Sequence, residues 1–175
     1  MTERELQMKG VDVVFGGVNI DEKVKVKGGY ANRILEFPSF ELSFVNRAGV
    51  RQDGWFLSGR NITDYYALIA VFGDFEDENG IDEGTIDHLN VLLVRKRSIE
   101  EHVKNSGVDL RNDIKRLSGG LFGDKISHFP GMYVKLSEKF SERPVNLVVR
   151  RDILLGLPCT REFTVRREYA EDAQN

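Results

Sequence analysis

The sequence contains one cysteine, Cys159, and only three histidines among 175 residues. A single cysteine excludes an internal disulfide framework and any cysteine-based zinc site. The histidines His88, His102 and His128 are widely spaced and form neither an HxH nor an HExxH pattern. That spacing argues against a histidine metal site. Neither residue type therefore predicts a metal centre.

Long hydrophobic runs are also missing. No apolar stretch approaches the roughly 18 residues that a membrane span needs, and the charged start Met1–Glu5 is not followed by the apolar segment of a secretory signal. With 41% hydrophobic residues, the chain is long enough to bury one ordinary core. We expect a soluble cytoplasmic protein with a single domain over residues 1–167, followed by a polar tail over 168–175.

The chain has no excess of positive charge, since its formal net charge is −3. Six acidic residues without an intervening base lie between Asp74 and Glu83, and without them the net charge of −3 would become +3. The basic residues elsewhere form local groups, among them Lys23/Lys25/Lys27, Arg95-Lys96-Arg97, Arg150-Arg151 and Arg166-Arg167. This distribution permits a phosphate-binding face without requiring one.

Strand patterns dominate the first half of the sequence, and helix patterns appear only later. The near-continuous apolar run 65–72 is typical of a central strand covered on both faces. We expect further strands at 11–16, 18–27, 39–45, 89–94, 132–136 and 145–149, an edge strand at 162–166, and helices at 99–105, 109–117 and 152–157. This order predicts an α+β fold with a mixed central β-sheet flanked by short helices.

The second strand carries charges on one face. Side-chain alternation places Asp21, Lys23 and Lys25 on the same side, and Val24 and Val26 on the opposite side. On an ordinary half-buried strand the valines would be buried and the three charged residues would lie in water. Periodicity alone therefore favours a hairpin with solvated charges.

Asp12 does not fit that ordinary interpretation. It lies among apolar residues, where a carboxylate is costly unless it is paired. A hairpin that turns at Gly16-Gly17 brings Asp12 beside Asp21 in cross-strand register. Two adjacent carboxylates repel each other, and a divalent cation relieves the repulsion.

An Asp on one strand followed by a (D/E)-x-K triplet on the next resembles the signature of the PD-(D/E)XK nuclease superfamily. The order of motifs is similar to that of a group of uncharacterised bacterial and phage proteins, a context that includes mobile elements. The similarity spans about residues 7–149. The matching segments are Gly10-x-Asp12, Asp21-Glu22-Lys23, Phe40-Glu41-Leu42-Ser43-Phe44, Gly54-Trp55, Thr63-Asp64-Tyr65-Tyr66 and Pro144-Val145-Asn146-Leu147.

This resemblance implies a restriction-endonuclease-like fold and Mg²⁺-dependent (or Mn²⁺-dependent) phosphodiester hydrolysis of DNA, with RNA as a further candidate substrate. Asp12 and Asp21 would bind the metal ion together with the backbone carbonyl of Glu22. Lys23 would orient or help deprotonate the attacking water and stabilise charge on the phosphate. Hydrolysis of a phosphodiester needs a Lewis acid and an activated water, and the compact charge of lysine suits a phosphate.

Other residues of this region have two interpretations. Glu41 is a candidate third carboxylate of the catalytic site, or a surface residue that alternates with apolar neighbours on its strand. Lys25 and Trp55 are candidate nucleic-acid contacts, although an aromatic residue such as Trp55 more often packs at the edge of a core. A homodimer would be consistent with one metal site that cuts one strand.

Superfamily members normally place a helix before the first motif strand, often with a glutamate that contributes to the site. Here nine residues precede Gly10, including Glu3 and Glu5, so we expect either a rudimentary helix or a chain that begins late relative to its relatives. The alternative function is a non-catalytic nucleic-acid-binding or protein-interaction module with a degenerate nuclease fold. A third alternative is a β-rich scaffold without a nucleic-acid role.

Overall fold

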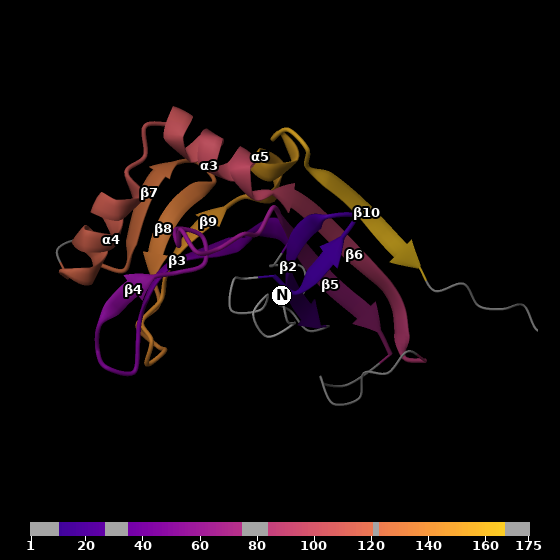
Figure 1. Ribbon diagram of the computed structural model, residues 1–175, viewed down its shortest axis with the longest axis horizontal. Helices are drawn as coiled ribbons and strands as arrows, with labels where there is room; N and C mark the ends of the chain where they lie inside the picture. The colour runs from indigo at the N-terminus through magenta and orange to yellow at the C-terminus, as the bar shows by residue number, and fades with distance from the viewer. Residues whose placement is uncertain (1–10, 27–34, 75–83, 121–122, 167–175) are drawn as a thin grey trace, which may run out of the picture.

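The computed structural model describes residues 11–26, 35–74, 84–120 and 123–166. Strands alternate with a few short helices in these ranges, as labelled in Figure 1. Their bounds are β1 Val13–Phe15, β2 Val18–Val26, β3 Ser39–Val45, β4 Arg51–Asp53, β5 Tyr65–Gly73, β6 Ile86–Arg95, α3 Lys96–Asn105, α4 Leu110–Ser118, β7 Lys125–Phe129, β8 Met132–Leu136, β9 Val145–Val149, α5 Arg151–Leu155 and β10 Arg161–Arg166.

The strands form two five-stranded sheets. The first sheet has the order β1-β2-β5-β6-β10 and the second has the order β4-β3-β9-β8-β7. In Figure 1 the first sheet lies on the right and the second on the left, with the helices along the upper and left-hand side. The first sheet is mixed, because β2 pairs with β5 in parallel while its other pairs are antiparallel.

The α+β class is confirmed, and so are the central position of β5 and the edge position of β10. The structure differs from the expected single central sheet, because β3, β8 and β9 pair with one another instead of extending β5 and β6. Two short strands, β4 and β7, were not predicted. The first residues, 1–10, and the proposed tail lie outside the described residues, so the expected N-terminal helix and the domain limits stay predictions.

The core lies between the two sheets and beneath the helices. Phe40 of the second sheet packs against Tyr66 of the first, with ring centroids 5.0 Å apart, and against Phe56 at 5.8 Å. The helices add side chains such as Ile99 and Leu154, which are almost fully buried in the same cluster. Burial of this apolar surface is the main force that holds the two sheets together.

Two local features follow directly from the sequence. The hairpin between β1 and β2 turns at Gly16 and Gly17, whose φ angles of 57° and 81° are accessible to glycine at little cost. Asp109 caps α4 by accepting a hydrogen bond from the backbone N–H of Asn112. In contrast, α3 begins at Lys96, directly after β6, and therefore three residues before the predicted start at 99. The hydroxyl of Ser98 donates to the Pro158 carbonyl.

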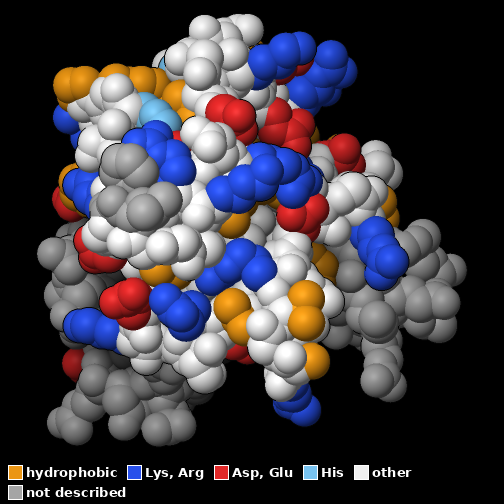
Figure 2. Space-filling model, turned by 90° about the vertical axis from the view of Figure 1, so that its left-hand side faces the viewer, with side chains coloured by type: hydrophobic (Ala, Val, Ile, Leu, Met, Phe, Trp, Pro, Cys, Tyr) orange, Lys and Arg blue, Asp and Glu red, His pale blue; other side chains and the backbone are white. Residues whose placement is uncertain are grey.

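The outer surfaces of the two sheets differ in character. The side that carries α4 and the second sheet shows Lys and Arg side chains with acidic side chains between them (Figure 2). None of the helices in the described ranges is long and apolar enough to cross a membrane.

Candidate metal-binding site

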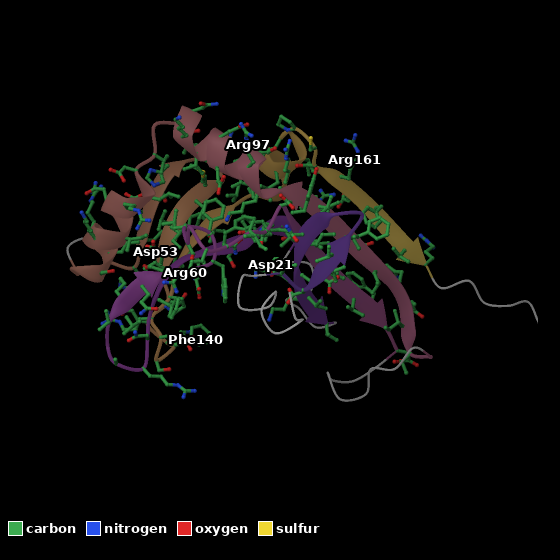
Figure 3. The ribbon with its side chains drawn as sticks, viewed as in Figure 1. Asp21, Asp53, Arg60, Arg97, Phe140 and Arg161 are labelled. Carbon is green, nitrogen blue, oxygen red and sulfur yellow. The ribbon has the colours of Figure 1, made fainter. Side chains whose placement is uncertain are left out.

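Asp21 is a buried carboxylate on the inner face of the first sheet, meaning the face that packs toward the second sheet. Only 6% of Asp21 is exposed, whereas Val24 on the opposite face is 49% exposed. This is the reverse of the ordinary half-buried strand, in which the valine would be covered and the charge hydrated. Figure 3 shows Asp21 directed into the space between the sheets.

Asp12 lies next to Asp21 across the hairpin. The pairing of β1 with β2 begins at Val13, which stands opposite Ile20, and Asp12 immediately precedes this pair. The carboxylate of Asp12 lies close enough to Asp21 to act on it through its charge and a hydrogen bond. The Asp12 backbone N–H donates to the Ile20 carbonyl at 2.9 Å, and the Asp12 carboxylate accepts a hydrogen bond from the Glu22 N–H at 2.8 Å. These bonds fix the carboxylate at the open edge of β2, just beyond the end of β1.

The electrostatics of this pair show a shortage of positive charge. Burial raises the pKa of Asp21 above its ordinary value, and the nearby charge and hydrogen bonding of Asp12 raise it further. Lys23 opposes this effect through an ion pair in which its Nζ lies 3.1 Å from the Asp21 Oδ2. The pKa of Asp21 nevertheless stays raised, so one lysine does not offset the burial of this carboxylate.

Glu41 approaches the same place from the second sheet. The charge of Lys23 acts on Glu41 as well as on Asp21, so the lysine lies near both carboxylates, and it forms an ion pair with Asp21. Burial raises the pKa of Glu41, while Lys23 and a hydrogen bond donated by the Trp55 backbone N–H oppose the rise. Glu41 is therefore not the solvated surface residue that strand alternation allowed.

The Gly54-Trp55 segment holds Glu41 in position. A Cβ on Gly54 would lie 2.6 Å from the Glu41 carbonyl oxygen, so only glycine fits here. The Phe56 N–H donates to the same Glu41 carbonyl at 3.0 Å. The side chain of Trp55 is 40% exposed beside this segment, and Lys25 is exposed further along β2, on the same face as Lys23.

Lys96 is a further member of this region that sequence analysis did not identify. It is 7% exposed, its Nζ lies 3.3 Å from the Asn61 Oδ1, and it is 3.8 Å from the Glu100 Oε1. Burial lowers the pKa of Lys96, and the carboxylates of Glu100 and Asp21 oppose that change. The only sequence signal was the Arg95-Lys96-Arg97 triplet, which gave no reason to expect a buried lysine near Asp21.

Comparison with protein families, with curated proteins and with solved structures found no match to this chain. Its function must therefore be argued from the site itself.

The residues present can accommodate a hard divalent cation. Two adjacent carboxylates supply oxygen ligands of the type that Mg²⁺ prefers. The carbonyl of Glu22 is on the same edge of β2 as its N–H, because both backbone groups of a strand residue point toward the same neighbour. Among the residues that the structure describes, no three Asp, Glu, His or Cys side chains lie close enough to hold a metal by themselves. Further oxygen ligands would have to come from the backbone or water.

Proposed function

We propose that this protein is a metal-dependent phosphodiesterase that cuts DNA, with its site at Asp12, Asp21, Lys23 and Glu41. The observation that carries the proposal is the buried Asp21 carboxylate beside Asp12, where Lys23 does not offset the burial. A site that lacks positive charge favours a cation. The order of the sequence motifs supports the same activity. It also supports a restriction-endonuclease-like fold, in which the mixed first sheet and its hairpin would carry the site.

The roles of the protein groups follow from their positions. Asp12, Asp21 and the Glu22 carbonyl would hold Mg²⁺ or Mn²⁺, which when bound supplies a Lewis acid for the phosphate oxygens. Lys23, which pairs with Asp21 and acts on Glu41 through its charge, would stand beside a phosphate or orient a water.

The surroundings of these groups supply a proton acceptor and a surface for the substrate. Glu41, whose pKa is raised by burial, is suited to accept a proton from that water. Lys25 and Trp55 are exposed next to these groups and would contact the sugar–phosphate chain and a base.

The test is nicking of supercoiled DNA by the full-length chain with Mg²⁺, with Mn²⁺ and with a chelator. We expect metal-dependent nicking that falls at least ~100-fold in Lys23→Ala, because general acid–base groups contribute that much. Asp21→Asn should lose nicking while remaining folded. Asp53→Asn is the matched control, since this carboxylate lies on β4 of the second sheet and forms a separate ion pair with Arg111 of α4. Equal nicking by the wild type and both site variants would refute the proposal, and a parallel assay on single-stranded RNA tests the wider substrate range.

One observation favours a second function, a nucleic-acid-binding module without cleavage. The described residues contain no cluster of three metal-ligating side chains, so the cation would depend on backbone and water ligands. In that case the wild type binds DNA with an affinity that falls steeply with salt, yet never nicks it. If the protein neither binds nor nicks DNA, the remaining alternative is a β-rich scaffold without a nucleic-acid role.

A further inference from the structure

The outer face of the first sheet, opposite to Asp21, is apolar, and in the described part of the chain the buried apolar side chains of α3, α4 and α5 pack elsewhere. Its residues follow from the strand register, which aligns one row of side chains across β2, β5, β6 and β10. Two such rows are entirely apolar. The first consists of Val24, Ile69, Val91 and Phe163, and the second of Val26, Val71, Leu89 and Val165.

These side chains are separate from the protein core. Val71 and Val91 are almost fully buried, although neither belongs to the core cluster. At the margins of the same face, Val24, Phe163 and Val165 are between 45% and 49% exposed. The buried side chains of α3, α4 and α5 that are apolar all pack into the core cluster on the other side. An apolar sheet face whose margins expose several large apolar side chains in this way marks an interaction surface.

The next row gives this face a charge pattern. It begins with Glu22 on β2, continues through Ala67 and Leu93, and ends with Arg161 on β10. Neither Glu22 nor Arg161 forms a salt bridge with another described residue. In Figure 3 Arg161 points away from the body of the molecule. The row therefore carries one unpaired charge of each sign at its two ends.

We propose that this face packs against the same face of a second copy of the chain. Strands β2 and β10 flank the central β5–β6 pair symmetrically. A two-fold axis that runs along the strands between β5 and β6 therefore lays β2 of one copy over β10 of the other. Glu22 of each copy then faces Arg161 of the other copy, so the dimer contains this charge pair twice. Each apolar row stacks on the same row of the other copy. Two sheets packed in this way lie about 10 Å apart in an aligned sandwich.

The available area sets the strength of this dimer. The four overlapping strands, about 4.8 Å apart and about 20 Å long, have a projected area on the order of 400 Å². Stable complexes bury about 800 Å² per partner, so we expect a dimer that dissociates in the micromolar range. The Asp21 site is on the opposite face and stays accessible, so the dimer does not depend on the proposed nuclease activity.

Sedimentation velocity of the full-length chain over the micromolar range tests the proposal. We expect a concentration-dependent dimer whose dissociation constant rises roughly tenfold or more in Phe163→Lys, because this aromatic side chain lies in the apolar rows. Phe140→Lys is the matched control, since Phe140 is 62% exposed in the loop between β8 and β9. Arg161→Glu should weaken the dimer, and the double variant Glu22→Arg/Arg161→Glu should restore it.

The charge-reversal variants keep the test decisive if Phe163→Lys folds poorly, because Arg161 is an exposed residue. A wild-type chain that stays monomeric at every concentration would overturn the proposal. It would do so even if Phe163→Lys melts at a lower temperature than the wild type, because the face would then be covered within one chain. Equal weakening of the dimer by Phe140→Lys and Phe163→Lys would also overturn it.

Discussion

The buried carboxylate of Asp21 gives a prediction whose sign follows from its surroundings. Because burial raises the pKa of Asp21, the folded state binds its proton more strongly than the unfolded state does. The free energy of unfolding therefore falls as the pH rises from the ordinary value of 3.8 through the higher folded pKa. At pH 7 the charged form lowers stability. We expect Asp21→Asn, which keeps the shape and removes the charge, to be more stable than the wild type in the absence of metal.

The size of the effect can be worked out approximately. Removing a functional group that is costly to bury commonly stabilises a protein by about 1 kcal/mol. The side chain of Lys23, which loses its partner, is 32% exposed and can be hydrated instead. For a chain of this length 1 kcal/mol corresponds to about 2–4 °C in melting temperature. We therefore expect Asp21→Asn to melt about 2–4 °C higher than the wild type at pH 7 in chelator.

Adding metal should reverse the order. A cation that binds only the folded state stabilises it by about 1.4 kcal/mol at tenfold excess over its dissociation constant. That corresponds to about 3–6 °C for the wild type, and Asp21→Asn should not respond. Differential scanning calorimetry with and without Mg²⁺ or Mn²⁺ measures both effects on the same samples.

Asp53 provides the control of opposite sign. Its hydrogen bonds with Arg111 lower the pKa of Asp53, so its contribution to stability is present above pH 3.8 and is lost as the pH falls through the lower folded pKa. Asp53→Asn should lower stability at pH 7, by less than about 1 kcal/mol because the side chain is 40% exposed and screened by solvent. This variant should keep the metal response. The prediction is contradicted if Asp21→Asn is less stable than the wild type in chelator, or if metal stabilises this variant as much as it stabilises the wild type.

Three further substitutions test the framework around the site. Gly54→Ala should lower the free energy of unfolding by about 2 kcal/mol or more in denaturant titrations, because its Cβ would collide with the backbone of Glu41. Asp109→Ala should cost about 1 kcal/mol in the same assay by removing the cap of α4. Ser98→Ala should cost about 1 kcal/mol because the hydrogen bond from the buried Ser98 hydroxyl to the Pro158 carbonyl is lost, and an unchanged unfolding midpoint would contradict that contact.

Local patterns predicted most of the elements. The strands Ser39–Val45, Met132–Leu136 and Val145–Val149 have the predicted bounds, since their apolar side chains alternate or run together between clear turn residues. Strands β4 and β7 were missed because they are short and carry mostly polar residues. Their pairing partners, not their own composition, make them strands. The division into two sheets depends on pairs such as Phe40 with Leu147, which are distant in sequence and which no local pattern encodes.

The candidate site was predictable only where it followed strand geometry. The turn glycines were sufficient to predict that Asp12 lies near Asp21, although the β1–β2 pairing already ends at Val13. Lys96 was not predictable, because it lies where β6 changes into α3 and neither the strand period nor the helix period applies. Its Nζ contacts Asn61, which is distant in sequence, as well as Glu100 one helical turn further along α3.

Strand β2 departs from the usual pattern on both of its faces. On the inner face it buries the carboxylate of Asp21, and on the outer face it exposes apolar residues such as Val24. Each feature lowers the stability of the isolated chain, and each would be relieved by a different partner, a cation inside and a second copy outside. Because the two partners would act on opposite faces and share no side chain, their effects should be additive within about 0.5 kcal/mol. Metal should thus raise the melting temperature by the same amount at low and high protein concentration. A metal effect that changes with concentration would show that the two faces are coupled.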